Sequence, residues 1–192
     1  MKQIFTTIAL VCMLGVLPID NNAYAASAAE NVIRTTTNKV LANPNRLRNE
    51  ATALKLVNKV FDFQKMSRSV LGKNWKKTSR KQKKRFIKAF RGLLVRTYSN
   101  ALIEAAGKVK RVEYNTSVKG NKATVRTRVY QKGKATPIKV KYKMKKRSGK
   151  WKAYNVIVGG VSLVNNYRSE FSNDIRTKGM DGLIKKINGL KK

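Results

Sequence analysis

Residues 138–145 read Ile-Lys-Val-Lys-Tyr-Lys-Met-Lys, so that apolar and lysine side chains alternate without a break. Because successive side chains of a β-strand point to opposite faces, this alternation predicts a strand with one dry face and one wet, cationic face. Residues 123–129 alternate in the same way, with Val125 and Val129 on the expected dry side. The two segments predict neighbouring strands of one antiparallel sheet.

Turn sequences divide this region of the chain into four strands. Gly120-Asn121, Lys132-Gly133 and Ser148-Gly149 are glycine-containing dipeptides of the kind that close β-hairpins. The last strand is predicted to run from about Trp151 to Val158 and to end at Gly159-Gly160. The predicted sheet is therefore a four-stranded antiparallel meander.

Helical periodicity before and after the sheet predicts helices that pack against it. Apolar residues at three- and four-residue spacing predict helices over residues 46–61 and 63–71, and residues 26–41 are predicted to form a further helix. Ser79 and Gln82 form a capping-box pattern at the start of a long central helix. That helix carries two adjacent apolar stripes, so we expect it to be buried over much of its circumference.

The C-terminal part of the chain is also predicted to be helical. Ser162 is expected to cap a helix that ends at Gly179, and a short last helix is predicted from about Met180. No internal repeat or low-complexity linker interrupts the chain. The elements together predict one domain of the α+β class.

The N-terminus has the pattern of a secretory signal peptide. An apolar stretch of fourteen residues, Ile4 to Leu17, is followed by the small-x-small cleavage site Ala23-Tyr24-Ala25. The stretch is too short to anchor the chain in a bilayer. We therefore predict a signal peptide over residues 1–25 and a single exported domain over residues 26–192.

The residue composition argues against catalysis. The chain contains no histidine, and its one cysteine, Cys12, lies in the predicted signal peptide. Imidazole acid–base catalysis, histidine-ligated metal sites and thiolate chemistry are therefore excluded for the mature chain. We predict a protein without catalytic residues, metal or cofactor. An isomerase or hydrolase that uses a buried carboxylate is the enzymatic alternative.

The charge of the chain indicates a polyanionic partner. Lys and Arg number 44 against 9 Asp and Glu, which gives a net charge of +35 at pH 7. Such a balance is typical of nucleic-acid binding, but an exported protein meets membrane surfaces and lipid headgroups instead. We expect transient contact with a membrane surface and no nucleic-acid partner. A secreted basic module that binds polyanions is the alternative function.

Several segments resemble the MlaC (toluene-tolerance) family in the family's order. Leu71-Gly72-Lys73-Asn74-Trp75 resembles its LG-x-x-W element, and residues 82–98 resemble its Q-x-x-x-F-x-x-x-F-x-x-L-L-x-x-T-Y helix. Residues 151–156 followed by 160–171 resemble its W-x-x-Y-D/N-V and G-V-S-L-V-x-N-Y-R-S-x-F block. Residues 179–184 resemble its closing G-x-D-x-L-I. The chain is identified as a member of this family.

The resemblance implies an NTF2-like fold, in which an antiparallel four-stranded sheet wrapped by helices encloses an apolar cavity for lipid tails. It implies a phospholipid-binding shuttle in the periplasm of a Gram-negative bacterium, which moves lipid between outer-membrane and inner-membrane complexes and maintains lipid asymmetry. The implied partners are phospholipid, an outer-membrane lipoprotein–porin complex and an inner-membrane ABC transporter that bears an MCE-domain ring.

The candidate lipid contacts come from the dry strand face and the helical stripes. They are Phe90, Leu94, Tyr98, Val125, Val129, Val140, Tyr142, Tyr154, Val156 and Tyr167. Only one parity of the last strand is expected to face inward, and Tyr154 and Val156 represent that parity. Core packing is the alternative role for each of these residues.

Basic residues are the candidates for headgroup or surface contact. They are Arg168, Lys139, Lys141 and Lys143. Arg168 has the alternative of capping a helix end or pairing with a carboxylate. The lysines have the alternative of a plain solvated face.

Overall fold

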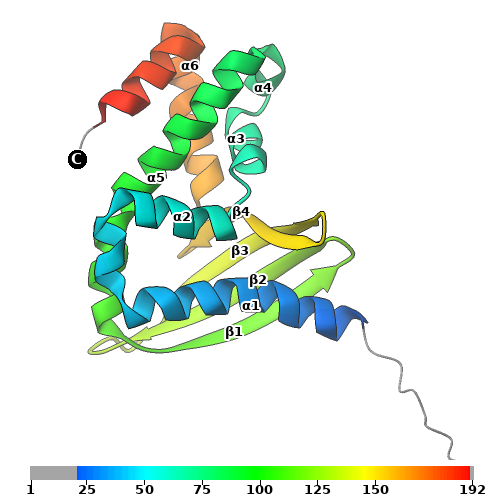
Figure 1. The fold of residues 1–192 in the computed structure, drawn as a ribbon, viewed down its shortest axis with the longest axis vertical. Coiled ribbons are helices and arrows are strands. Elements are labelled where there is room, and N and C mark those ends of the chain that lie inside the picture. Colours follow the sequence, from blue (N-terminus) through cyan, green and yellow to red (C-terminus); the bar gives the residue numbers. More distant parts are fainter. Residues whose placement is uncertain (1–20, 191–192) are drawn as a thin grey trace, which may run out of the picture.

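A computed structural model describes residues 21–190 of the chain (Figure 1). Most of the predicted signal peptide lies outside these residues, and the predicted cleavage site after Ala25 falls within the first described helix, α1 (Asn21–Ala42). None of the helices in this part of the chain has the length and apolar character of a membrane span. The described residues form an antiparallel sheet with helices packed on one face and stacked beyond it.

The sheet has five antiparallel strands in chain order. The strands are β1 (Val109–Lys119), β2 (Lys122–Gln131), β3 (Ile138–Arg147), β4 (Lys150–Val158) and β5 (Val161–Ser162). The predicted meander is confirmed for β1 to β4, whereas the predicted number of four strands is wrong by one. Gly159 and Gly160 have φ values of 56° and 93°, which glycine adopts without strain. They turn the chain so that Val161 pairs with Val158.

The side chains of β2 and β3 alternate between a dry and a wet face, as predicted. Val125 lies opposite Tyr142 and Thr127 lies opposite Val140 in the register of the two strands. All four side chains are buried or half-buried, whereas the lysines between them on β3 are exposed. The dry face of the sheet is therefore defined by this register.

The prediction that β4 keeps one inward parity is wrong. Tyr142 lies opposite Val156, but after a register shift Met144 lies opposite Ala153. Tyr154 is the extra residue at this bulge, so the dry face passes from one parity of β4 to the other. The Tyr154 ring lies beside a helix instead, where the Nζ atom of Lys65 is 4.7 Å from its centroid.

The described helical elements are α1 (Asn21–Ala42), the 3-10 helix η1 (Pro44–Arg48), α2 (Glu50–Val60), α3 (Phe63–Leu71), α4 (Asn74–Lys77), α5 (Arg80–Lys108) and α6 (Leu163–Gly189). The helix predicted over residues 46–61 is divided at Asn49, whose side chain accepts a hydrogen bond from the Thr52 amide and caps α2. The predicted break at Gly179 is present as a kink within α6, where φ is 67°.

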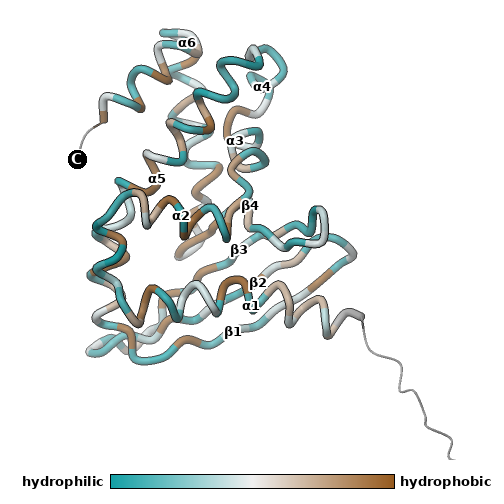
Figure 2. The backbone as a smooth tube through the Cα atoms, in the orientation of Figure 1, coloured by the Kyte–Doolittle hydropathy of each residue, from teal (hydrophilic) through white to brown (hydrophobic). Residues whose placement is uncertain are grey.

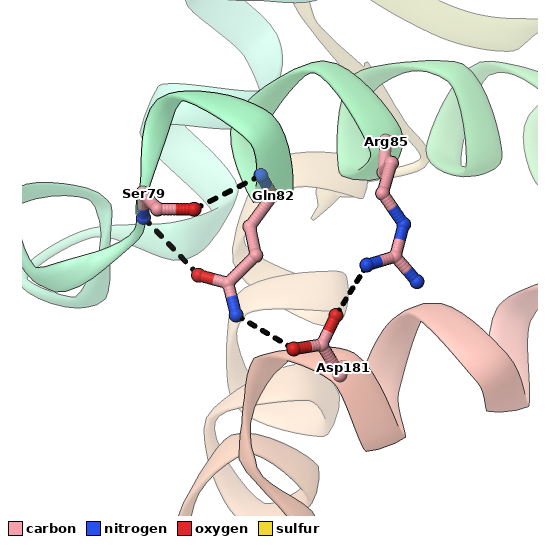
Figure 3. Close-up of polar contacts among 4 residues, drawn as sticks. All are labelled: Ser79, Gln82, Arg85 and Asp181. Carbon is pink, nitrogen blue, oxygen red and sulfur yellow. Dashed lines mark hydrogen bonds and ion pairs between the residues drawn. The ribbon is translucent and has the colours of Figure 1, made fainter.

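A hydrogen-bonded network ties the start of α5 to the part of α6 beyond its kink (Figure 3). Ser79 and Gln82 form the predicted capping box. The Nε2 atom of Gln82 donates to Asp181 at 2.8 Å, and Arg85 pairs with the same carboxylate at 2.5 Å. The hydrogen bond from Gln82, aided by Arg85, lowers the pKa of Asp181. Its stabilising contribution is therefore present at neutral pH and is lost as the pH falls through that lowered pKa.

Most buried apolar side chains belong to two separate clusters, which we call the helical core and the sheet core. The helical core comprises Phe63, Met66, Val70, Leu71, Phe86, Ala89, Phe90, Leu93, Val164, Tyr167, Phe171, Leu183, Ile184 and Ile187. The sheet core comprises Ala29, Ile33, Val60, Ala123, Val125, Met144, Trp151 and Ala153. Phe61 packs against both clusters. Figure 2 shows hydrophobic stretches both in the helices and in the strands beneath α1.

Candidate functional site

The dry face of the sheet is covered over only part of its length. Ala29 and Ile33 of α1 pack on Val125 and Met144, which are fully buried in the sheet core. Figure 1 shows α1 lying across the strands at this part of the sheet. Helix α1 therefore covers the part of the dry face that carries Val125 and Met144.

The other part of the dry face, where β3 begins and β4 ends, is apolar and becomes more exposed toward β5. Val140 is 9% exposed, Ile138 37%, Val158 43% and Val161 65%. The register places Val140, Val158 and Val161 in one row across three strands, and Ile138 lies opposite Val129. We call these five residues, together with Val156, the open apolar face. Three of its members, Ile138, Val158 and Val161, are exposed, and aliphatic side chains exposed on one side of a sheet are candidates for contact with an apolar ligand or partner.

Helix α5 carries an apolar stripe that opens toward the same end of the sheet. Leu94 and Tyr98 are half-buried against the helical core, and Leu102 is 50% exposed. The helix runs directly into β1, whose first residue, Val109, lies opposite Gln131 at the end of β2. Leu102, at the exposed end of this stripe, therefore lies toward the same end of the sheet as the open apolar face.

The structure divides the predicted lipid contacts among several places. Val129, Val140 and Val156 lie in the open apolar face, and Tyr142 lies beside Val140 on the same face. Residues in other surroundings are Phe90 and Tyr167 in the helical core, Leu94 and Tyr98 at its edge, Val125 in the sheet core and Tyr154 beside α3. Contact of any of these residues with lipid stays a prediction.

Three exposed members of the open apolar face were not among the predicted contacts. Ile138 has the parity of Val140 in the same alternating segment, so that pattern contained the information needed to find it. Val158 has the parity of Val156. Val161 had no corresponding signal, because β5 was not predicted.

The opposite face of the sheet is strongly cationic. Lys139, Lys141 and Lys143 are exposed on β3. In the register, Lys139 lies opposite Arg128 and Lys141 lies opposite Arg126. Like charges directly opposite each other destabilise a sheet. These basic residues therefore repel one another across the two strands, and this repulsion is offset in part where Arg128 pairs with Glu113 at 4.0 Å.

Arg168 occupies the end of a helix. Its Nε and Nη2 atoms donate to the carbonyl oxygen of Ser69 at 2.9 and 2.5 Å, in the last turn of α3. Such bonds satisfy a carbonyl that has no partner within the helix. The geometry favours the helix-capping alternative for this side chain over headgroup contact.

The one carboxylate that is buried among the described residues is part of an ion pair. The carboxylate of Asp174 in α6 accepts from the Nζ atom of Lys186 at 2.7 Å, and this hydrogen bond raises the pKa of Lys186. Asp174 does not belong to the open apolar face. Over residues 21–190, no group of three or more acidic side chains is placed to hold a metal ion.

Burial raises the pKa of two tyrosines that were predicted to contact lipid. It raises the pKa of Tyr142 to about 12, with a smaller contribution from nearby Tyr114. Burial likewise raises the pKa of Tyr167, and the adjacent Tyr98 adds to the shift. Both phenols are therefore neutral at physiological pH and can act as hydrogen-bond donors.

Two hollows on the described surface contain none of the predicted lipid contacts. One of about 640 Å³ is lined by Lys110, Arg111, Tyr130, Gln131, Lys132, Gly133 and Lys134. The other, of about 360 Å³, is lined by Glu50, Leu54, Arg85, Lys88, Ala89, Arg91, Gly92, Arg96, Ile184 and Asn188. Both contain many charged side chains, so neither has the character expected of a site for lipid tails.

Comparison with known proteins gives a consistent result over most of the chain. Residues 26–189 match the model of the family described as MlaC protein. The intermembrane phospholipid transport system binding protein MlaC of Haemophilus influenzae is 28% identical over 168 residues, which cover 85% of this chain and 77% of that protein. The toluene tolerance protein ttg2D of Pseudomonas putida is 27% identical over 191 residues, covering 94% and 86%.

A solved structure shares the fold. The phospholipid-binding protein of Ralstonia solanacearum, solved in complex with a phospholipid, matches with a TM-score of 0.73 and 22% sequence identity. The match covers 85% of this chain and 94% of that one. The predicted α+β fold, an antiparallel sheet wrapped by helices, is confirmed.

Proposed function

Because this chain belongs to the MlaC family, we propose that it binds phospholipid on the open apolar face and carries it across the periplasm. The relatives described above are named for phospholipid binding, phospholipid transport and toluene tolerance, which are not the names of enzymes. The predicted signal peptide supports a periplasmic location. The function is the transfer of a lipid without a chemical change to it.

The observation that carries the proposal is the exposure of Ile138, Val158 and Val161 on an otherwise dry sheet face. Leaving aliphatic area in water costs about 25 cal/mol per Å², so a bound acyl chain that covers these side chains stabilises the protein. Helix α5 presents Leu102 at the same end of the sheet, which adds a second apolar element.

The energetics of lipid transfer explain why such a carrier needs protein partners. Burial contributes about 0.8 kcal/mol per methylene, and roughly thirty methylenes of a two-chain lipid amount to about 20 kcal/mol. A bilayer offers the same burial, so exchange between bilayer and carrier is close to balanced. The barrier is the exposure of the tails during transfer. Docking lowers this barrier, and the proposed docking partners are an outer-membrane lipoprotein–porin complex and an inner-membrane ABC transporter with an MCE-domain ring.

The cationic sheet face supplies a second part of the proposal, a transient contact with anionic membrane surfaces. Each basic residue near an anionic bilayer contributes about 1 kcal/mol of attraction. Lys139, Lys141 and Lys143 lie on one strand and point to one side, so they reach a flat surface together. The attraction offsets the repulsion between the opposed basic residues of β2 and β3.

We expect the triple variant Lys139→Gln, Lys141→Gln, Lys143→Gln to bind anionic vesicles about 100-fold more weakly, since three contacts of about 1 kcal/mol are lost. Sedimentation with phosphatidylglycerol vesicles at low salt measures this. The control variant loses the same charge at Lys55, Lys59 and Lys77, which are exposed on helices α2 and α4. Equal weakening in both variants would show a response to net charge alone and would contradict a defined membrane-binding face.

The direct test of lipid binding uses the mature protein, purified from a periplasmic fraction without detergent. Organic extraction and mass spectrometry are expected to detect phospholipid in about stoichiometric amount. A stably folded, lipid-free protein that takes up no phospholipid from vesicles or from loaded partner complexes would refute the carrier function. Salt-dependent binding of heparin by that lipid-free protein would favour the polyanion-binding alternative.

A further inference from the structure

One row of residues crosses the dry face of the whole sheet and changes in character along its length. Successive strand pairings connect its members directly: Tyr114 on β1, Thr127 on β2, Val140 on β3, Val158 on β4 and Val161 on β5. The β3 to β5 end of the row is aliphatic and belongs to the open apolar face. The β1 and β2 end carries two hydroxyl groups.

These two hydroxyl groups are buried without a hydrogen-bond partner. Thr127 is 3% exposed, and neither its Oγ1 atom nor the Tyr114 hydroxyl has a partner among the described residues. Native proteins avoid unpaired buried hydroxyls because the groups lose their hydration without replacement. Hydroxyls close by are satisfied, since Thr116 donates to Glu30 and Tyr130 donates to Glu113.

Resting on the proposed function, we propose that the Tyr114 and Thr127 hydroxyls donate hydrogen bonds to the ester carbonyls of a diacyl phospholipid. Its acyl chains lie along Val140, Val158 and Val161. The polar and apolar ends of the row then match the polar and apolar parts of one ligand.

The surroundings of the polar end fit the headgroup side of such a lipid. The Arg34 guanidinium of α1 lies 4.0 Å from the centroid of the Tyr114 ring, which places a cation beside the tyrosine of this end. Arg34 also pairs with Glu30 at 2.6 Å, so its charge is held in position there. Tyr142 lies on β3 in the next row of the dry face, opposite Val125.

The proposal predicts a preference for ester-linked over ether-linked lipid, because an ether lipid of the same chain length lacks the carbonyl acceptors. We expect the wild-type protein to load the ester form about tenfold in excess from vesicles that contain equal amounts of both. A tenfold ratio corresponds to the free-energy cost of leaving one buried hydrogen-bond donor unpaired. Mass spectrometry of the extracted lipid measures the ratio.

Removal of the hydroxyls is expected to abolish the preference. Thr127→Val keeps the side-chain shape, and together with Tyr114→Phe it should bring the ester-to-ether ratio close to one without lowering thermal stability. Tyr130→Phe removes a hydroxyl from the opposite side of β2 and should leave the ratio unchanged. Comparison among variants loaded from the same vesicles cancels any effect of the donor bilayer.

The outcomes separate this inference from the function on which it rests. Wild-type protein that loads ester and ether lipid equally would overturn the hydroxyl contacts and leave the carrier function intact. A preference that persists in the double variant would also overturn them. Failure to load either lipid would overturn the carrier function and the inference together.

Discussion

Val158→Glu is expected to lower phospholipid retention at least tenfold while leaving the fold intact. Val158 lies in the centre of the row of valines on the open apolar face and is 43% exposed. In the lipid-free protein the new carboxylate is hydrated, so the free energy of unfolding should change by about 0.5 kcal/mol or less. In the lipid-bound protein the carboxylate would be covered by an acyl chain, and burial of an unpaired charge costs several kcal/mol.

The measurements for this prediction are the lipid-to-protein ratio after detergent-free purification and the thermal unfolding of the same samples. Lys150→Gln is the matched control, because it makes the same change in net charge at an exposed position near the other end of β4. The control should retain wild-type lipid content. If Val158→Glu also retained full lipid content, the open apolar face would not be the binding surface.

The arrangement of the sheet followed from local patterns in the sequence. Alternation over residues 138–145 predicted which side chains of β3 lie on each face, and glycine-containing turns predicted the hairpins. These features depend on residues that are close together in the chain. The bulge at Tyr154 and the short strand β5 depend instead on how β4 meets β3 and turns back, so no local pattern announced them.

The candidate site was harder to predict than the fold, because periodicity identifies an apolar face without showing what covers it. Val125 and Val140 lie on the same face of neighbouring strands, yet only Val125 belongs to the sheet core beneath α1. Phe90 was predicted to contact lipid on the evidence of a helical stripe, and it lies in the helical core. The family resemblance, now confirmed by the match over residues 26–189, indicated lipid before any cavity or surface could be located.

The two faces of the sheet have complementary properties for a carrier of phospholipid. The dry face leaves Ile138 and Val158 exposed, and the wet face places lysines opposite arginines. Each arrangement is unfavourable in the isolated chain, and under the proposed function each would be relieved by one part of a membrane. Acyl chains would cover the first face, and anionic headgroups would neutralise the second.

Phe90→Ala is expected to destabilise the protein by about 3–5 kcal/mol, which is the range for removing a fully buried phenylalanine. The Phe90 ring is inaccessible to solvent and packs between three other rings of the helical core. Its centroid lies 5.6 Å from that of Phe86, 5.9 Å from Phe171 and 5.3 Å from Tyr167. Truncation leaves a cavity among these rings of α5 and α6, which are too closely packed to close it.

Urea denaturation of lipid-free protein measures this loss, and it separates a core role for Phe90 from a role in lining the lipid site. A residue that lines a lipid site has part of its contact surface supplied by the ligand, so truncation should cost less than about 1.5 kcal/mol without lipid. Phe90→Leu is the matched variant, because it retains most of the side-chain volume and should cost clearly less than Phe90→Ala. A small loss for Phe90→Ala, combined with reduced lipid retention, would place this ring in the lipid site and extend the site from the sheet into the helices.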